Sequence, residues 1–142
     1  MLSLVSLLGN NAEYGLVGAT EKIDFCNDEN MMVLNMISLV ELCKLFLPHM
    51  YKNRHGGILN VSSTGAFQPG PFTSTYFASK AFVLGYSKVI RLEAEKYNVH
   101  VCTLCPGATK TNSFAREGTD LPKTSMPADE VAAKSNNIVI LD

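Results

Sequence analysis

Short apolar segments alternate with longer amphipathic ones along the chain. The short ones are almost continuously apolar, which is typical of strands buried on both faces of a parallel sheet. They cover Leu2–Leu8, Ile58–Val61 and Val99–Leu104. Stretches with helical periodicity run from Met36 to Asn53 and from about Ser74 to Tyr97. The alternation predicts an α/β fold, a partial doubly wound (Rossmann-like) parallel sheet flanked by helices.

Local signals mark the ends of several segments. Residues 27–29 (Asn-Asp-Glu) supply the cap and the acidic first turn of a helical region, and Pro48 is expected to kink the apolar helix. Residues 108–126 are rich in Gly, Thr, Ser and Lys, which predicts a lid over a binding site. Pro127 opens a short helix, and Ile138–Leu141 is expected to form a last strand.

Size and composition indicate one globular domain over residues 1–142. The chain is 46% hydrophobic and 18% charged, with a formal net charge of −1. No basic stripe is present, so a nucleic-acid partner is not expected. Met1–Leu8 is too short to span a bilayer and lacks the basic start of a signal peptide, so no membrane contact is expected.

The four cysteines do not have the density of a disulfide scaffold, which favours a reducing, cytoplasmic setting. Cys102 and Cys105 have metal-ligand spacing but no second ligand pair. The histidines are scattered, at positions 49, 55 and 100. We therefore expect no metal site.

Tyr76 and Lys80 carry the most informative spacing. On a helix they stand at i and i+4, on the same face. Lowering a tyrosine pKa from about 10 to near neutrality costs ~4 kcal/mol, and a neighbouring cation supplies roughly 1–3 of the ~3 units needed. A second positive charge, such as an oxidised nicotinamide ring, would supply the rest. Ser63 ends the preceding strand, where its hydroxyl can bond the same substrate oxygen as Tyr76.

Several motifs agree in order and spacing with a known family. They are Asn10-Asn11-Ala12, Asn35, the strand Gly57–Ser63, Tyr76-x-x-x-Lys80 and the segment Cys105–Thr111. Together they resemble the short-chain dehydrogenase/reductase family over residues 5–134. The family's turn has glycine after the alanine, where this chain has Glu13. A close approach to the cofactor is compromised there, and a carboxylate beside the cofactor is unfavourable.

The resemblance implies a role for each matching catalytic residue. Tyr76 would be the general acid and base on the substrate oxygen, and Lys80 would lower its pKa and hold the nicotinamide ribose. Ser63 would donate a hydrogen bond to the substrate oxygen. Asn35 would position a water that links Lys80 to solvent.

The same resemblance implies the residues that bind an NAD or NADP cofactor. Asn10, Asn11 and Ala12 would line its adenosine-ribose side. The nicotinamide and its amide would be wrapped by Pro106, Gly107 and Thr111. The substrate would be a small-molecule alcohol or ketone, small or apolar, which the sequence does not identify further.

The chain resembles only the C-terminal part of the family. It contains no Gly-x-x-x-Gly-x-Gly turn, whose amides bind the pyrophosphate and whose neighbourhood distinguishes NAD from NADP. We therefore expect weak cofactor binding by this truncated chain. Leu2–Leu8 would be a bare sheet edge and the two long helices carry excess apolar residues, so we expect a homodimer or higher homo-oligomer.

Three functions remain open at this stage. The first is an NAD(P)(H)-dependent oxidoreductase that interconverts an alcohol and a carbonyl by hydride transfer. The second is a truncated, catalytically inactive fragment that acts at most as an association module. The third is a nucleotide-sugar epimerase or dehydratase, because these enzymes share Tyr-x-x-x-Lys.

Overall fold

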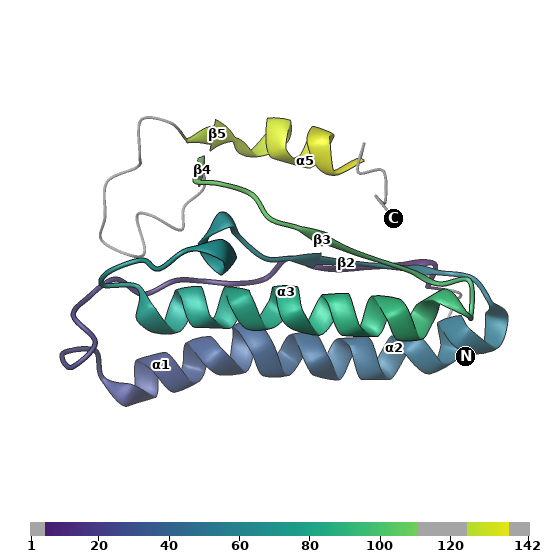
Figure 1. Ribbon diagram of the computed structural model, residues 1–142, viewed down its shortest axis with the longest axis horizontal. Helices are drawn as coiled ribbons and strands as arrows, with labels where there is room; N and C mark the ends of the chain where they lie inside the picture. Colours follow the sequence, from purple (N-terminus) through teal and green to yellow (C-terminus); the bar gives the residue numbers. More distant parts are fainter. Residues whose placement is uncertain (1–4, 111–124, 137–142) are drawn as a thin grey trace.

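The chain forms a three-stranded parallel sheet covered by long helices. The computed structural model describes residues 5–110 and 125–136. The strands are β1 (Leu7–Asn10), β2 (Gly57–Val61) and β3 (His100–Leu104), in the order β1-β2-β3. In Figure 1 the long helices lie together on one side of this sheet. The predicted partial doubly wound fold is confirmed.

The first helical region runs without a break from Phe25 to Asn53. It consists of α1 (Phe25–Met32), the π-helical segment η1 (Val33–Ser38) and α2 (Leu39–Asn53). The helix begins earlier than the acidic signal at residues 27–29 predicted. The reason is Asp24, whose side chain accepts a 2.8 Å hydrogen bond from the Cys26 amide and caps the helix.

The helix continues through Pro48, where a kink was predicted. Its departure from α-helical hydrogen bonding lies upstream, in η1. α2 ends at Arg54, which is left-handed with φ of 50°, and Gly56 follows with φ of 145°. These two residues end the helix and turn the chain into β2.

Phe25–Asn53 is also, by length and composition alone, apolar enough to cross a membrane. A helix at the core of a soluble protein passes the same test. In this structure Leu39, Cys43, Leu47 and Met50 of α2 are buried in the core. Packing in the core therefore accounts for these four apolar residues, whereas Leu42 and Leu45 of the same helix are exposed.

β1 differs from its prediction. It covers Leu7–Asn10, shifted toward the C-terminus from Leu2–Leu8, of which residues 2–4 lie outside the described part. The side chain of Leu7 is 67% exposed, so burial on both faces was wrong for it. The reason is that β1 is the edge of the described sheet, paired with β2 alone in parallel register, Leu7 opposite Gly57.

The other strands and α3 form close to where they were predicted. β2 pairs with β3 in parallel, with Gly57 opposite His100. The helix α3 (Ser74–Glu95) joins these two strands, preceded by the 3₁₀ turn η2 (Thr64–Phe67). Both α2 and α3 contact the sheet, and their buried faces enclose the core.

A smaller parallel pair stands apart from the main sheet. It is formed by β4 (Thr109–Lys110) and β5 (Met126–Pro127), and α5 (Ala128–Asn136) follows as predicted. Residues 111–124 of the predicted lid and the predicted strand Ile138–Leu141 lie outside the described residues.

Candidate active site

A cavity of about 840 Å³ opens at the carboxyl ends of the three parallel strands. This is the end of an open α/β sheet where ligands bind. Ser63 and Tyr76 both line the cavity, as do Pro106 and Gly107 after β3. The structure therefore brings residues from three separate sequence motifs to one cavity.

Tyr76 and Lys80 are one turn apart on α3, as the sequence predicted. The Lys80 Nζ lies 5.7 Å from the centre of the Tyr76 ring. Ser62 fixes this part of the helix to the end of β2, because its hydroxyl donates a 2.8 Å hydrogen bond to the Lys80 carbonyl. The helix thus presents both side chains next to the strand that ends in Ser63.

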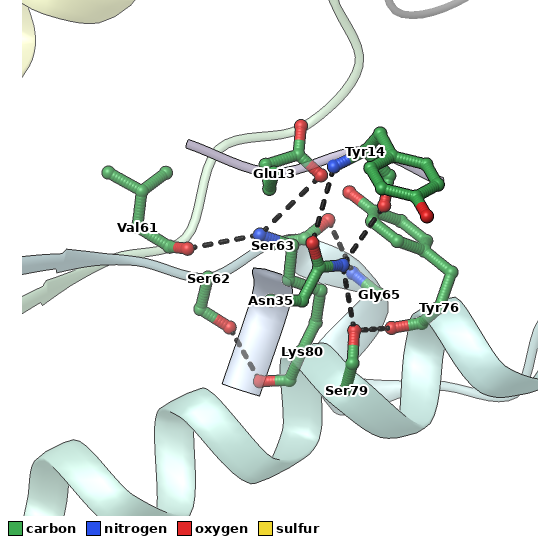
Figure 2. A network of polar contacts seen from close by, with 10 residues as sticks. All are labelled: Glu13, Tyr14, Asn35, Val61, Ser62, Ser63, Gly65, Tyr76, Ser79 and Lys80. Carbon is green, nitrogen blue, oxygen red and sulfur yellow. Dashed lines mark hydrogen bonds and ion pairs between the residues drawn. The ribbon is translucent and has the colours of Figure 1, made fainter. Parts of the chain in front are cut away.

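Lys80 is almost completely buried, with 2% of its side chain exposed. Its ammonium donates a 3.1 Å hydrogen bond to the Val61 carbonyl and lies 3.6 Å from the Glu13 Oε2 (Figure 2). Burial lowers the pKa of Lys80 below its ordinary value, and the negative charge of Glu13 partly opposes that effect. Glu13 is therefore the counter-ion of Lys80 in this structure.

Ser63 has a structural as well as a potential chemical role. Its Oγ accepts a 3.1 Å hydrogen bond from the Gly65 amide and caps η2. The backbone at Gly65 is tightly packed, since an added Cβ would lie 3.0 Å from the Phe77 ring. This turn fixes Ser63 at the wall of the cavity.

Asn35 lies in η1 and is buried, with 3% of its surface exposed. Its Nδ2 donates to the Tyr14 carbonyl at 2.9 Å and to the Ser79 Oγ at 3.2 Å, and its Oδ1 accepts from the Tyr14 amide at 3.3 Å. Figure 2 shows this side chain between the Tyr14 backbone and α3. Its side chain thus holds the segment that carries Glu13. The predicted water relay stays a prediction.

The residues predicted to bind the cofactor divide into three groups. Asn11 and Ala12 line the cavity with Pro106 and Gly107. The side chain of Asn10 instead points into the core, where its Nδ2 donates to the Asn60 Oδ1 at 2.8 Å. Thr111 lies outside the described residues.

Asn10 belongs to a buried polar network that the sequence did not reveal. Asn60 is fully buried and its Nδ2 donates a 2.8 Å hydrogen bond to the Ser87 Oγ. Ser87 in turn donates to the Val83 carbonyl at 2.7 Å. The network joins the end of β1 to β2 and α3, and so fixes the start of the turn that leads to Glu13.

The groups that line the cavity are compatible with the nicotinamide end of a dinucleotide. Gly9 and Gly107 line it, and a Cβ added at either would meet nothing within 4 Å. A flat ring can therefore approach the backbone closely at both positions. Tyr76 and Ser63 stand at the same cavity with hydroxyl groups for a substrate oxygen. Lys80, the group expected to hold the ribose, is engaged by Glu13.

No group of three or more His, Cys, Asp or Glu side chains in residues 5–110 and 125–136 is arranged to hold a metal ion. All four cysteines are free. Burial raises the pKa of the Cys105 thiol, opposed by a hydrogen bond with Ser62 and by nearby lysines.

Comparison with known proteins identifies what the chain is similar to. The short chain dehydrogenase family model matches residues 1–122. A 3-ketodihydrosphingosine reductase of Bacteroides thetaiotaomicron is 37% identical over 107 residues, which are 75% of this chain and 40% of the relative. The chain thus spans less than half the length of that relative.

Solved structures of short-chain dehydrogenases and reductases also resemble this chain in fold. A short-chain dehydrogenase from Sphingobium yanoikuyae in complex with NADPH matches with a TM-score of 0.90 and 29% identity, over 93% of this chain and 52% of that one. A 3-ketoacyl-(acyl-carrier-protein) reductase from Brucella melitensis complexed with NADH matches with a TM-score of 0.82 and 26% identity, over 93% and 58% of the two chains.

Proposed function

Because the chain belongs to the short-chain dehydrogenase/reductase family, we propose that it acts as an NAD(P)(H)-dependent oxidoreductase that interconverts an alcohol and a carbonyl compound. One observation carries the proposal. Tyr76 and Ser63, from α3 and from the end of β2, line the same cavity, and the Lys80 ammonium lies 5.7 Å from the Tyr76 ring. These are the groups that a proton transfer to a carbonyl oxygen requires.

Each residue has one task in this proposal. In reduction the Tyr76 phenol donates its proton to the carbonyl oxygen, and in oxidation the tyrosinate accepts the hydroxyl proton. The Ser63 hydroxyl donates a hydrogen bond to the same oxygen as negative charge develops on it. A bound nicotinamide cofactor would supply or accept the hydride.

The positive charge of Lys80 favours the tyrosinate. The Lys80 Nζ lies 5.7 Å from the centre of the Tyr76 ring, close enough for its charge to act on the phenol. Glu13 offsets part of this charge, because its carboxylate lies 3.6 Å from the same ammonium.

Asn11, Ala12, Pro106 and Gly107 would hold the cofactor, as NAD or NADP. We expect weak binding, because the sequence has no Gly-x-x-x-Gly-x-Gly turn to bind the pyrophosphate. For the substrate we propose an apolar ketone or alcohol. The support is the apolar part of the cavity wall, which is made by Leu16, Val17, Phe77, Leu104 and Val131.

Isotope transfer tests the proposed reaction. The chain is incubated with NADPH or NADH that carries deuterium at both C4 positions of the dihydronicotinamide and with a panel of apolar ketones, and the products are analysed by mass spectrometry. The proposal predicts an alcohol that carries deuterium on the carbinol carbon. Absence of any deuterated alcohol with either cofactor would contradict it and would favour the catalytically inactive alternative.

We also propose that the chain forms a homodimer or higher homo-oligomer and acts in the cytoplasm. Five large apolar side chains on α2 and α3 are exposed, by 38% to 71%. They are Leu42, Leu45, Phe82, Val89 and Leu92. An apolar surface of this kind is typical of a contact with another protein, and the edge strand β1 adds unpaired backbone groups within the described sheet.

A further inference from the structure

Glu13 stands between the cavity and Lys80. Glu13 lines the cavity and has 23% of its side chain exposed, whereas Lys80 is 2% exposed and is not part of the cavity wall. The two charged groups are 3.6 Å apart. A ligand that enters the cavity therefore meets the carboxylate before it can reach the ammonium.

The charge of Lys80 makes this contact strong. A buried ammonium is unfavourable unless it is paired. The Lys80 Nζ contacts the Val61 carbonyl, the Tyr76 ring and the Glu13 carboxylate, and of these three groups the carboxylate carries the negative charge. The pair is therefore expected to persist in the absence of a ligand.

The backbone at Glu13 is also held in place, through hydrogen bonds between Asn35 and the next residue, Tyr14. Asn35 forms hydrogen bonds with both the amide and the carbonyl of Tyr14, the residue next to Glu13. This two-point contact fixes the backbone from which the Glu13 side chain reaches Lys80.

We propose that Glu13 blocks the access of a nucleotide ribose to Lys80, so that a cofactor binds Lys80 only after the ion pair is broken. The identity of the ligand rests on the proposed function, but the block is a property of the two side chains. In a chain with glycine at this position, the ammonium would face the cavity. On this reasoning Glu13 weakens cofactor binding.

Acetylation of Lys80 by a water-soluble N-hydroxysuccinimide ester, followed by peptide mass spectrometry, tests the block without turnover. Glu13→Gly removes both the charge and the bulk, and we expect it to raise the rate at Lys80 by roughly tenfold or more. Glu13→Gln keeps the shape without the charge and should give a smaller increase. The exposed Glu21, in the same connecting segment, provides the control Glu21→Gln, which should leave the rate unchanged.

The exposed Lys44 and Lys88 serve as internal references for the activity of the ester, and far-UV circular dichroism reports whether each variant keeps its fold. Equal rates at Lys80 in the unmodified chain, Glu13→Gly and Glu13→Gln would overturn the proposal. Glu13→Gln is nearly isosteric and keeps the experiment informative if Glu13→Gly is unstable.

Addition of NADPH separates this inference from the proposed function. We expect saturating NADPH to slow the acetylation of Lys80 in Glu13→Gly and to leave it unchanged in the unmodified chain. Equal protection in both would contradict the block. If Glu13→Gly makes Lys80 reactive and neither NADPH nor NADH protects it, the block holds and the proposed cofactor site is wrong.

Discussion

Substitution of Asn35 by alanine should loosen the segment that carries Glu13. Three hydrogen bonds of 2.9, 3.2 and 3.3 Å would be lost, two to the Tyr14 backbone and one to Ser79. At about 0.5–1.5 kcal/mol each, the loss is roughly 1.5–4.5 kcal/mol. The net loss should lie in the lower part of this range, because two of the three hydrogen bonds are long and because water can reach the half-buried Tyr14 and replace part of the contact. We therefore expect a decrease of about 2 kcal/mol in the free energy of unfolding.

Urea denaturation followed by circular dichroism measures this change, and hydrogen exchange locates it. The Tyr14 amide should exchange faster in Asn35→Ala than in the unmodified chain. Asn53→Ala is the matched control, because the exposed Asn53 donates to the His49 carbonyl one turn earlier in the same helix, and it should change stability by under about 0.5 kcal/mol. An Asn35→Ala chain with unchanged stability and unchanged exchange at Tyr14 would refute the reasoning.

Gly56, Lys80 and the apolar faces of α2 and α3 can each be tested by a separate measurement. Gly56→Ala should lower the free energy of unfolding by about 2 kcal/mol, measured by urea denaturation. The reason is that the φ of Gly56 is 145° and an added Cβ would lie 2.6 Å from the Met50 Cγ. An unchanged free energy of unfolding would contradict this. Burial lowers the pKa of Lys80 in the folded chain, so between that lowered pKa and the ordinary value of 10.5 the unfolded chain binds more protons than the folded one. The free energy of unfolding, measured relative to Lys80→Met, should therefore rise as the pH rises toward 10.5. A fall would show that folding raises the pKa of Lys80. Light scattering after gel filtration over a hundredfold concentration range should show a dimer or larger species, and a monomer throughout would exclude the proposed association.

The parts of the fold set by local pattern could be predicted from the sequence. The apolar runs placed β2 and β3 within one residue of where they form, and the Tyr76 and Lys80 spacing placed both residues one turn apart on α3. Such features depend on the period of side chains along one element. The match of several motifs then indicated the family correctly.

The features that depend on contacts distant in sequence were not predicted. The Glu13 ion pair joins the segment after β1 to α3, and nothing in the local pattern around Glu13 indicates its partner. Asn10 was expected at the cofactor, but its side chain pairs with Asn60, fifty residues away in sequence. The exposure of Leu7 depends on the position of β1 at the edge of the sheet, which hydrophobicity along the chain does not encode. The sequence offered one sign that Glu13 is unusual: the corresponding turn of the family has glycine at this position.

The central claim is that Tyr76 transfers the proton in an alcohol–carbonyl interconversion. Its most direct test is the turnover of NADPH and NADH with an apolar ketone, followed by absorbance of the reduced nicotinamide, in the unmodified chain and in Tyr76→Phe. Phenylalanine keeps the ring and removes the hydroxyl, so the fold is expected to persist. We predict a decrease of about 10²–10⁴-fold in turnover. A Tyr76→Phe chain with the turnover of the unmodified chain would contradict the claim.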